Sequence, residues 1–380
     1  MSATPVRRVT VVAALLTTLL LAACGGEIQR NSPSASRSAA SFPPSQFPPQ
    51  TYKGLSGSLT VYDSDGGSSM AAKGRTIYQN FTDLTGVRVS SDFNSDTSKF
   101  LAAMQAGTPQ WNVIEFPTVG DFINAKKHGY LEKLDPAIVP VNKLQDGTYD
   151  PYGYHVEQYG IVLAWNTKKW PSSGPHPTSM TDLFNTKQFP GKRCLFKYPE
   201  FGATLESALL ADGVAPSQLY PLDVDRAFAK LNTIKNDIVW WDSGERAIQY
   251  LTSGECDLGV AWSGRVFNAV ERQHLPLDFT WNQALFTSGV LAIPKNAPNP
   301  RAAQALLAMW IHDQQGQREF LSTGVPYPTP ITGVTYPASL SKWLPLGENL
   351  KQAIAENDEY YAANIDELSK RFTAWVGGSS

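Results

Sequence analysis

The chain has 380 residues, of which 42% are hydrophobic and 17% charged, and its formal net charge is −2 at pH 7. One hydrophobic core rarely organises more than about 250 to 300 residues, so this length and ordinary globular composition predict two lobes. A near-neutral chain lacks the basic excess typical of nucleic-acid-binding proteins, so we expect no nucleic-acid partner.

The first segment has the pattern of an export signal. Arg7 and Arg8 precede an uncharged apolar run over 9–23, which is short for a membrane span and typical of a signal-peptide core. The small residues that precede Cys24 resemble a bacterial lipobox. We therefore predict a signal peptide over 1–23 and a lipid on Cys24 that anchors the protein to the outer side of the cell membrane. An ordinary secretory cleavage site is the alternative, and two arginines do not distinguish the Sec route from the twin-arginine route.

The segment after Cys24 is rich in Ser, Pro and Ala. It contains too few apolar residues to offset the entropy lost on ordering. We predict a flexible tether over 24–56 between the lipid and a folded body.

Two cysteines remain in the body, Cys194 and Cys256. An even pair in an exported protein favours a disulfide. Each cysteine stands just ahead of a short apolar run, so the two could lie at the starts of neighbouring strands. Two free thiols are the alternative, because the sequence does not supply the Cα separation that a bridge requires.

Strands and helices alternate in the first half of the body. The patterns predict strands over 58–62, 87–91 and 111–116, and helices over 71–85, over 97–105 and up to Gly129. Units of this length imply parallel strands with right-handed crossovers. Ligands of such sheets lie beyond the carboxyl ends of the strands, here near 62–65 and 115–118.

An apolar run over 159–166 is predicted to cross into a second lobe. There the alternation resumes, with predicted strands over 194–196, 258–262 and 289–294 and helices over 179–185, from 203, over 224–235, over 300–313, over 348–356 and over 364–375. The stretch 240–265 combines a helix start with a strand that ends at Trp262 and Arg265. This layout predicts one wall of a ligand crevice.

Several segments resemble the spermidine/putrescine type of ABC-transporter solute-binding proteins, in the order found in that family and over most of 58–375. They are the lipobox, YGIVLAWN, FPGKRCLFKYPEFGATLESALLADGV, IVWWDSGERAIQYLTSGECDLGVAWSGR, TWNQ, VLAIPKNAPN and YPTP. The resemblance implies an α/β fold of the periplasmic-binding-protein type II class, in which two lobes, each a mostly parallel sheet flanked by helices, enclose the solute in a cleft. It implies lobe 1 over 57–164 and 285–335, and lobe 2 over 165–284 and 336–377.

The resemblance further implies a monomer without cofactor or metal that captures a polyamine-like solute and delivers it to the membrane subunits of an ABC permease. A polyamine requires carboxylates for its ammonium groups and aromatic faces along its methylenes. The candidate ligand residues are Tyr62, Asp63, Asp65, Phe116, Glu200, Trp241, Ser243, Trp262, Arg265, Trp281, Asn282 and Tyr327. Most have a plain structural alternative: solvated carboxylates, packing aromatics, or, for Ser243, a helix N-cap.

The sequence departs from the polyamine pattern at two places. Where polyamine receptors carry a tryptophan and an aspartate before the return strand, this chain has Thr287 and Gly289, and after the third strand only Phe116 is aromatic. Arg265 could instead pair with a carboxylate, which would suit an amino acid or a γ-aminobutyrate-like solute.

Two further alternatives remain open. Tyr360 and Tyr361 form a pair of the kind that ferric-ion receptors use, although they fall in a predicted helix where packing is the simpler role. An extracytoplasmic hydrolase is the alternative of another class. The five histidines are scattered and no nucleophile motif is present, so we predict a binding protein and not an enzyme.

Overall fold

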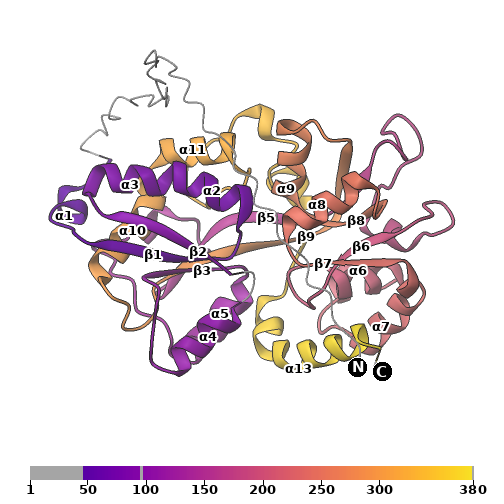
Figure 1. Ribbon diagram of the computed structural model, residues 1–380, viewed down its shortest axis with the longest axis horizontal. Helices are drawn as coiled ribbons and strands as arrows, with labels where there is room; N and C mark the ends of the chain where they lie inside the picture. The colour runs from indigo at the N-terminus through magenta and orange to yellow at the C-terminus, as the bar shows by residue number, and fades with distance from the viewer. Residues whose placement is uncertain (1–45, 95–96, 379–380) are drawn as a thin grey trace, which may run out of the picture. The chain divides into compact units, whose positions relative to one another are not determined.

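The computed structural model describes residues 46–94 and 97–378 (Figure 1). The predicted signal peptide, Cys24 and the first part of the predicted tether lie outside the described residues. Among the helices of the described residues, none is long and apolar enough to span a bilayer.

Lobe 1 is built on three parallel strands, β1 (Ser58–Asp63), β2 (Arg88–Phe93) and β3 (Val113–Phe116), with β1 in the middle. Figure 1 shows α2 and α3 on one side of these strands and α4 and α5 on the other. The helices of this lobe are α2 (Gly67–Arg75), α3 (Ile77–Thr85), α4 (Ser98–Gln105), α5 (Val119–Lys127), α10 (Pro300–His312) and α11 (Gln314–Thr323). The parallel order predicted from the sequence is confirmed.

The helix predicted over 71–85 is two helices. It breaks at Thr76, which has φ −112° and ψ −96° and whose hydroxyl donates to the carbonyl of Ala72 at 2.8 Å. A β-branched residue whose side chain bonds back to the preceding turn favours such a break. Gly86 ends the second helix in the left-handed conformation, as its position predicted.

Lobe 2 repeats the parallel arrangement with β6 (Arg193–Phe196) between β7 (Ile238–Trp241) and β8 (Leu258–Trp262). Its helices are α6 (Thr204–Ala211), α7 (Val224–Asn232), α8 (Gly244–Ser253), α9 (Ser263–Phe267) and α13 (Asp358–Val376). The short α12 (Glu348–Gln352) and β10 (Ile354–Ala355) precede α13.

Two long strands join the lobes. β5 (Gly153–Asn166) and β9 (Leu277–Ala292) pair antiparallel, β9 pairs with β3 and β5 pairs with β8, which gives one sheet of order β2-β1-β3-β9-β5-β8-β6-β7. The sequence patterns predicted only a part of each strand, because polar residues interrupt the apolar alternation of both. The predicted lobe boundaries stay predictions, since both long strands contribute to the cores of both lobes.

The last part of the range 24–56, predicted as a tether, contains a short helix that packs on the body. Residues from 46 onward are described, and they include α1 (Pro49–Tyr52), whose Tyr52 is 4% exposed beside the equally buried Phe47. The Tyr52 hydroxyl is 2.8 Å from Nδ1 of His312 at the end of α10. Two buried aromatic side chains, with hydrogen bonds from Arg301 to the carbonyls of Gln50 and Lys53, hold this Pro-rich segment against lobe 1, an effect that its average composition conceals.

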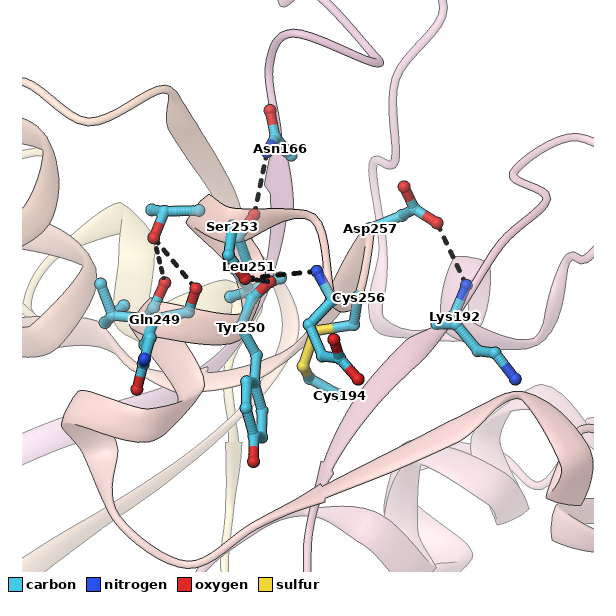
Figure 2. The surroundings of a disulfide bond; sticks show 12 residues. Asn166, Lys192, Cys194, Gln249, Tyr250, Leu251, Ser253, Cys256 and Asp257 are labelled. Atoms are coloured by element: carbon cyan, nitrogen blue, oxygen red, sulfur yellow. Dashed lines mark hydrogen bonds between the residues drawn. A yellow bond between two sulfur atoms is a disulfide. The ribbon is translucent and has the colours of Figure 1, made fainter.

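Cys194 of β6 and Cys256, which precedes β8, form a disulfide with a Cα separation of 5.7 Å (Figure 2). The two strands are parallel neighbours, with Arg193 opposite Leu258, so the cysteines lie near the starts of adjacent strands. Around the bridge, the side-chain amide of Asn166 donates to the carbonyl of Leu251 at 2.9 Å (Figure 2). The bridge therefore joins lobe 2 internally and does not link the lobes.

Candidate functional site

Two grooves lie where the lobes meet. The larger, about 350 Å³, has Pro117 and Asp121 of lobe 1 on one side and Glu200 and Phe201 of lobe 2 on the other, with α13 at its edge. The smaller, about 220 Å³, is lined by Ser68 from the start of α2 and by residues of α8 and α9.

Arg265 crosses from lobe 2 to lobe 1. Its Nη1 donates to Ser68 Oγ at 2.9 Å and its Nη2 to the carbonyl of Asp65 at 2.7 Å, while Glu245 Oε1 lies 3.4 Å from Nη1. The side chain is 2% exposed, and its buried Nε has no hydrogen-bond partner. Burial alone would lower the pKa of Arg265, but Glu245 and the other acidic groups around it raise that pKa. The guanidinium is thus a buried cation with one unused N–H.

A lysine surrounded by carboxylates lies on the lobe 1 side of this contact. Nζ of Lys73, on α2, is 2.6 Å from Glu115, 3.1 Å from Asp63, and 3.3 Å from both Asp65 and Glu157. We call these four carboxylates the first acid cluster. Lys73 is fully buried, and no carboxylate side chain of the cluster is more than 10% exposed.

The strands bring this cluster together. Asp63 ends β1, Glu115 lies on the neighbouring β3, and Glu157 lies on β5 between Val156 and Gln158, where the register with β9 shifts. Glu157 has φ +49°, a left-handed conformation that is costly for a residue with a side chain and that recurs at functional positions. Oδ1 of Asp63 accepts from the amides of Asp65 and Gly66 at 3.0 and 2.9 Å, which shapes the loop before α2.

Burial and charge act in opposite directions on these carboxyl groups. Burial raises the pKa of Glu115 to about 7 although Lys73 opposes the shift, and burial together with the neighbouring Asp65 raises the pKa of Glu157 well above its usual value. Burial also acts to raise the pKa of Asp65, but Lys73, Glu157 and Arg265 together lower it below its usual value. Oxygens of Asp65, Glu115 and Glu157 lie within 4.8 Å of one another, a spacing that can hold a metal ion. Here the Lys73 ammonium supplies the positive charge at that position.

Aromatic side chains from both lobes pack beside Arg265. The centre of the Tyr159 ring lies 5.3 Å from that of Tyr327 and 5.6 Å from that of Phe201. The centres of the Phe201 and Trp262 rings are 4.5 Å apart. The Trp262 indole donates to the carbonyl of Phe201 at 3.1 Å, and the Tyr327 hydroxyl accepts from the amide of Gly264 at 3.2 Å. We call these four residues the aromatic group. All four are at most 5% exposed and pack on one another between buried charges, and Phe201 lines the larger groove. Aromatic side chains with a few charged groups are typical of sites for small solutes.

The structure brings six of the predicted residues to the junction of the lobes. Asp63, Asp65 and Arg265 take part in the charged contacts described above, and Trp262 and Tyr327 belong to the aromatic group. Glu200 lines the larger groove.

The other predicted residues lie elsewhere. Tyr62 and Phe116 pack around Phe100 in the core of lobe 1, and Trp241 is 1% exposed in the core of lobe 2. Ser243 is the N-cap of α8 and accepts from the amide of Arg246, as its alternative role predicted. Trp281 and Asn282 lie outside the junction. The Trp281 indole donates to the carbonyl of Lys342, and the side-chain amide of Asn282 donates to the carbonyl of Thr178.

Sequence reasoning missed the central residues Lys73, Glu115, Glu157, Tyr159 and Phe201. One signal was available, because Glu115 and Glu157 are charged residues inside strands that are otherwise buried. A buried carboxylate needs a partner, and that requirement could have prompted a search for an internal cation such as Lys73.

A two-lobe α/β body with buried opposite charges and aromatic rings at the lobe junction defines the class of extracytoplasmic solute receptors. A family model described as bacterial extracellular solute-binding protein matches residues 76–345. The chain belongs to this family.

Named relatives agree with this assignment. The chain is 32% identical over 329 residues to the gamma-aminobutyric acid-binding protein of Pseudomonas aeruginosa, an alignment that covers 84% of this chain and 91% of the relative. The structure of the Atu4243-GABA receptor is 30% identical, with a TM-score of 0.74 over 85% of this chain and 98% of that one. An ABC transporter substrate-binding protein from Bradyrhizobium japonicum is 33% identical, with a TM-score of 0.75 over 84% of this chain and 99% of that one.

The predicted fold and the predicted absence of enzymatic activity are thereby confirmed, and the family places the protein outside the cytoplasm. It is a solute-binding protein of the ABC-transporter type. The narrower resemblance to polyamine receptors stays a prediction.

Proposed function

We propose that the protein captures a small amino acid with well-separated ammonium and carboxylate groups, of the γ-aminobutyrate class, and delivers it to an ABC permease. The observation that carries this proposal is the unused Nε of Arg265 at the lobe junction, beside the aromatic group. A buried guanidinium N–H without an acceptor is costly, and a solute carboxylate would supply that acceptor through a charge-assisted hydrogen bond. The two relatives whose names contain γ-aminobutyric acid support the same class of solute.

A polyamine fits the same residues less well. It carries no anionic group for Arg265, and the position among the first acid cluster that its ammonium would take is held by Lys73 at 2.6 to 3.3 Å. Thr287 and Gly289 also disfavour a polyamine, because polyamine receptors carry a tryptophan and an aspartate at these two positions. For the ferric alternative, the rings of Tyr360 and Tyr361 stand at 81° to each other, and the Tyr361 hydroxyl donates to Glu206. This tyrosine is thus engaged within lobe 2.

Lipidation of Cys24 would hold this receptor beside its permease. The lipobox resemblance supports the anchor, and the Ser- and Pro-rich residues that follow supply the reach between membrane and body. Mass spectrometry of the membrane fraction tests this part of the proposal. A Cys24→Ala variant should lose both the lipid mass and the membrane association.

Titration calorimetry of the purified protein tests the solute class. We expect γ-aminobutyrate to bind, and butyrate, which has no ammonium, to bind more weakly. Spermidine, putrescine and ferric citrate serve as the competing candidates. Tight binding of a polyamine without binding of γ-aminobutyrate would overturn the proposal, as would tight ferric binding.

A further inference from the structure

A second group of carboxyls, two of them buried and one half-buried, lies in lobe 2, next to the long strands. Glu206 of α6 is fully buried, Glu356 is 7% exposed just before α13, and Asp358 is the first residue of α13. We call these three residues the second acid cluster. Oε1 of Glu206 accepts from the hydroxyls of Tyr361 and Tyr220, which fixes one side of the cluster.

The second acid cluster has no cation of its own. Over residues 46–94 and 97–378, no ion pair involves any of its members, and one buried oxygen of each carboxyl group (Glu206 Oε2, Glu356 Oε1 and Asp358 Oδ1) has no hydrogen-bond partner. Burial raises the pKa of Glu356 well above its usual value, and Glu206 and Asp358 raise it further. Burial also raises the pKa of Asp358, to about 7. Buried carboxylates without a positive partner are costly, so a cation that enters the protein would be stabilised there.

An independent polar group is aimed at the same place. Thr287 of β9 is 4% exposed, its hydroxyl has no hydrogen-bond partner of normal geometry, and it lies close enough to Glu356 to lower the pKa of that carboxyl. Thr287 belongs to a long strand that joins the lobes, whereas Glu356 follows β10. The backbone N–H of Glu356 donates to the carbonyl of Phe286 at 3.0 Å, which places Glu356 beside Thr287, and Oε1 of Glu356 has no hydrogen-bond partner. An ammonium group has three donors for such oxygens.

The cluster lies directly behind the wall of the candidate site. The backbone amide of Phe201 also acts on Glu356, and Phe201 both lines the larger groove and belongs to the aromatic group. Phe201 and Ala203 have φ +65° and +54°, so the segment that separates groove and cluster is held in a strained conformation. Tyr159 of β5 lies opposite Thr287 of β9, and burial together with the charges of Glu356 and Asp65 raises the pKa of its hydroxyl well above the usual value.

We propose that Glu356 and Thr287 bind the ammonium group of the solute, with Glu206 and Asp358 adding negative charge behind them. This inference rests on the proposed function, in which Arg265 holds the carboxylate of the same solute. The aromatic group then lies along the methylenes between the two ends.

A chelated metal ion fits this cluster less well. Among the described residues, only Asp65, Glu115 and Glu157 of the first acid cluster form a group of carboxyls with oxygens within 4.8 Å. The second acid cluster is more widely spread, and a metal ion needs several close ligands at once. An ammonium needs only one carboxylate oxygen and one hydroxyl at hydrogen-bond distance.

Calorimetric titration of the wild-type protein and of Glu356→Gln with γ-aminobutyrate, butyrate and putrescine tests the inference. The substitution keeps the shape and removes the charge, so we expect it to weaken γ-aminobutyrate by about 10- to 100-fold and to leave the weak binding of butyrate unchanged. Glu348→Gln is the matched control, because that side chain is 81% exposed and should leave every affinity unchanged. Thermal melting of each variant reports whether it is folded.

The outcomes separate this inference from the proposed function. Equal affinity of wild type and Glu356→Gln for γ-aminobutyrate would overturn the ammonium site while keeping the proposed function. Binding of putrescine alone, lost in Glu356→Gln, would overturn the proposed function and keep the ammonium site. Failure of every amine to bind wild type would overturn both. A melting shift when sodium replaces choline at constant ionic strength, seen in wild type and absent from Glu356→Gln, would assign the cluster to an inorganic cation instead.

Discussion

The two acid clusters consist of the same residue types, aspartate and glutamate, but only the first contains a cation. In the first, Lys73 contacts four carboxylates at 2.6 to 3.3 Å. In the second, the contacts to Glu206 come only from neutral tyrosine hydroxyls, and no lysine or arginine of the described chain pairs with Glu356. The side chains of the first cluster are at most 10% exposed, the second cluster is buried at Glu206 and Glu356 and half-buried at Asp358, and both flank the aromatic group.

The difference indicates a division of roles. A cluster with its own ammonium is complete without a solute, so it stabilises the loop before α2 and the strained Glu157. A cluster that lacks a cation is complete only when a solute brings one. We therefore expect changes in the first cluster to act mainly on stability and changes in the second to act mainly on affinity.

The largest effect is expected from Lys73→Met. Removal of the ammonium leaves four buried carboxylates without a partner, so the free energy of unfolding should fall by about 3 to 5 kcal/mol at pH 7.5. Urea unfolding followed by circular dichroism measures this change. Lys351→Met, at an exposed pair with Glu348, is the control and should change stability by less than about 0.5 kcal/mol. A loss as small as in the control would show that the first cluster does not depend on Lys73.

Arg265→Lys comes next and tests the anionic end of the solute. A lysine keeps the charge but has no Nε–H in the guanidinium plane, so the dissociation constant for γ-aminobutyrate should rise by about tenfold or more. Arg246→Lys on α8 is the control, because Arg246 is exposed. Calorimetry at fixed pH gives both values. Unchanged affinity in Arg265→Lys would remove this residue from the solute site.

The pH dependence of stability, compared between wild type and Glu356→Gln, tests the contribution of the second acid cluster. Asp358 and Glu115, with ordinary pKa values of 3.8 and 4.5, have pKa values raised to about 7 in the folded protein. The folded state then holds protons that the unfolded state has released, so the free energy of unfolding should fall as pH rises from about 4 to about 7. Glu356→Gln should make this decline shallower, because it removes a buried carboxyl whose own pKa is raised well above its usual value. Urea unfolding at several pH values checks this, and an identical slope in wild type and variant would contradict it.

Thr287→Val is expected to have the smallest effect. It removes a buried hydroxyl and keeps the shape, so affinity for γ-aminobutyrate should fall by about 2- to 10-fold while stability stays equal or rises slightly. Thr332→Val, at an exposed position, is the control. If Thr287→Val binds like wild type, then Glu356 acts without the hydroxyl.

The sequence predicted the class of fold and parts of the site because both depend on local patterns of apolar residues. Strands over 58–62, 111–116 and 258–262 have local apolar patterns, and the ends of parallel strands in an α/β sheet are ligand positions, so Asp65 and Arg265 could be placed near a solute. Predictions made from aromatic character alone were less informative. Tyr62, Phe116 and Trp241 lie in cores, because a large aromatic side chain serves packing as readily as binding.

Local pattern therefore determined the alternation of strands and helices and gave the cysteine pairing as one of two alternatives. It also predicts an export signal, which lies outside the described residues. Tertiary structure alone decided which charges meet. Lys73 and Glu157 are 84 residues apart in the sequence, and Glu206 and Glu356 are 150 residues apart. Because the pKa of a buried carboxyl depends on neighbours within a few ångströms, only the folded chain shows that one acid cluster has its own cation and the other has none.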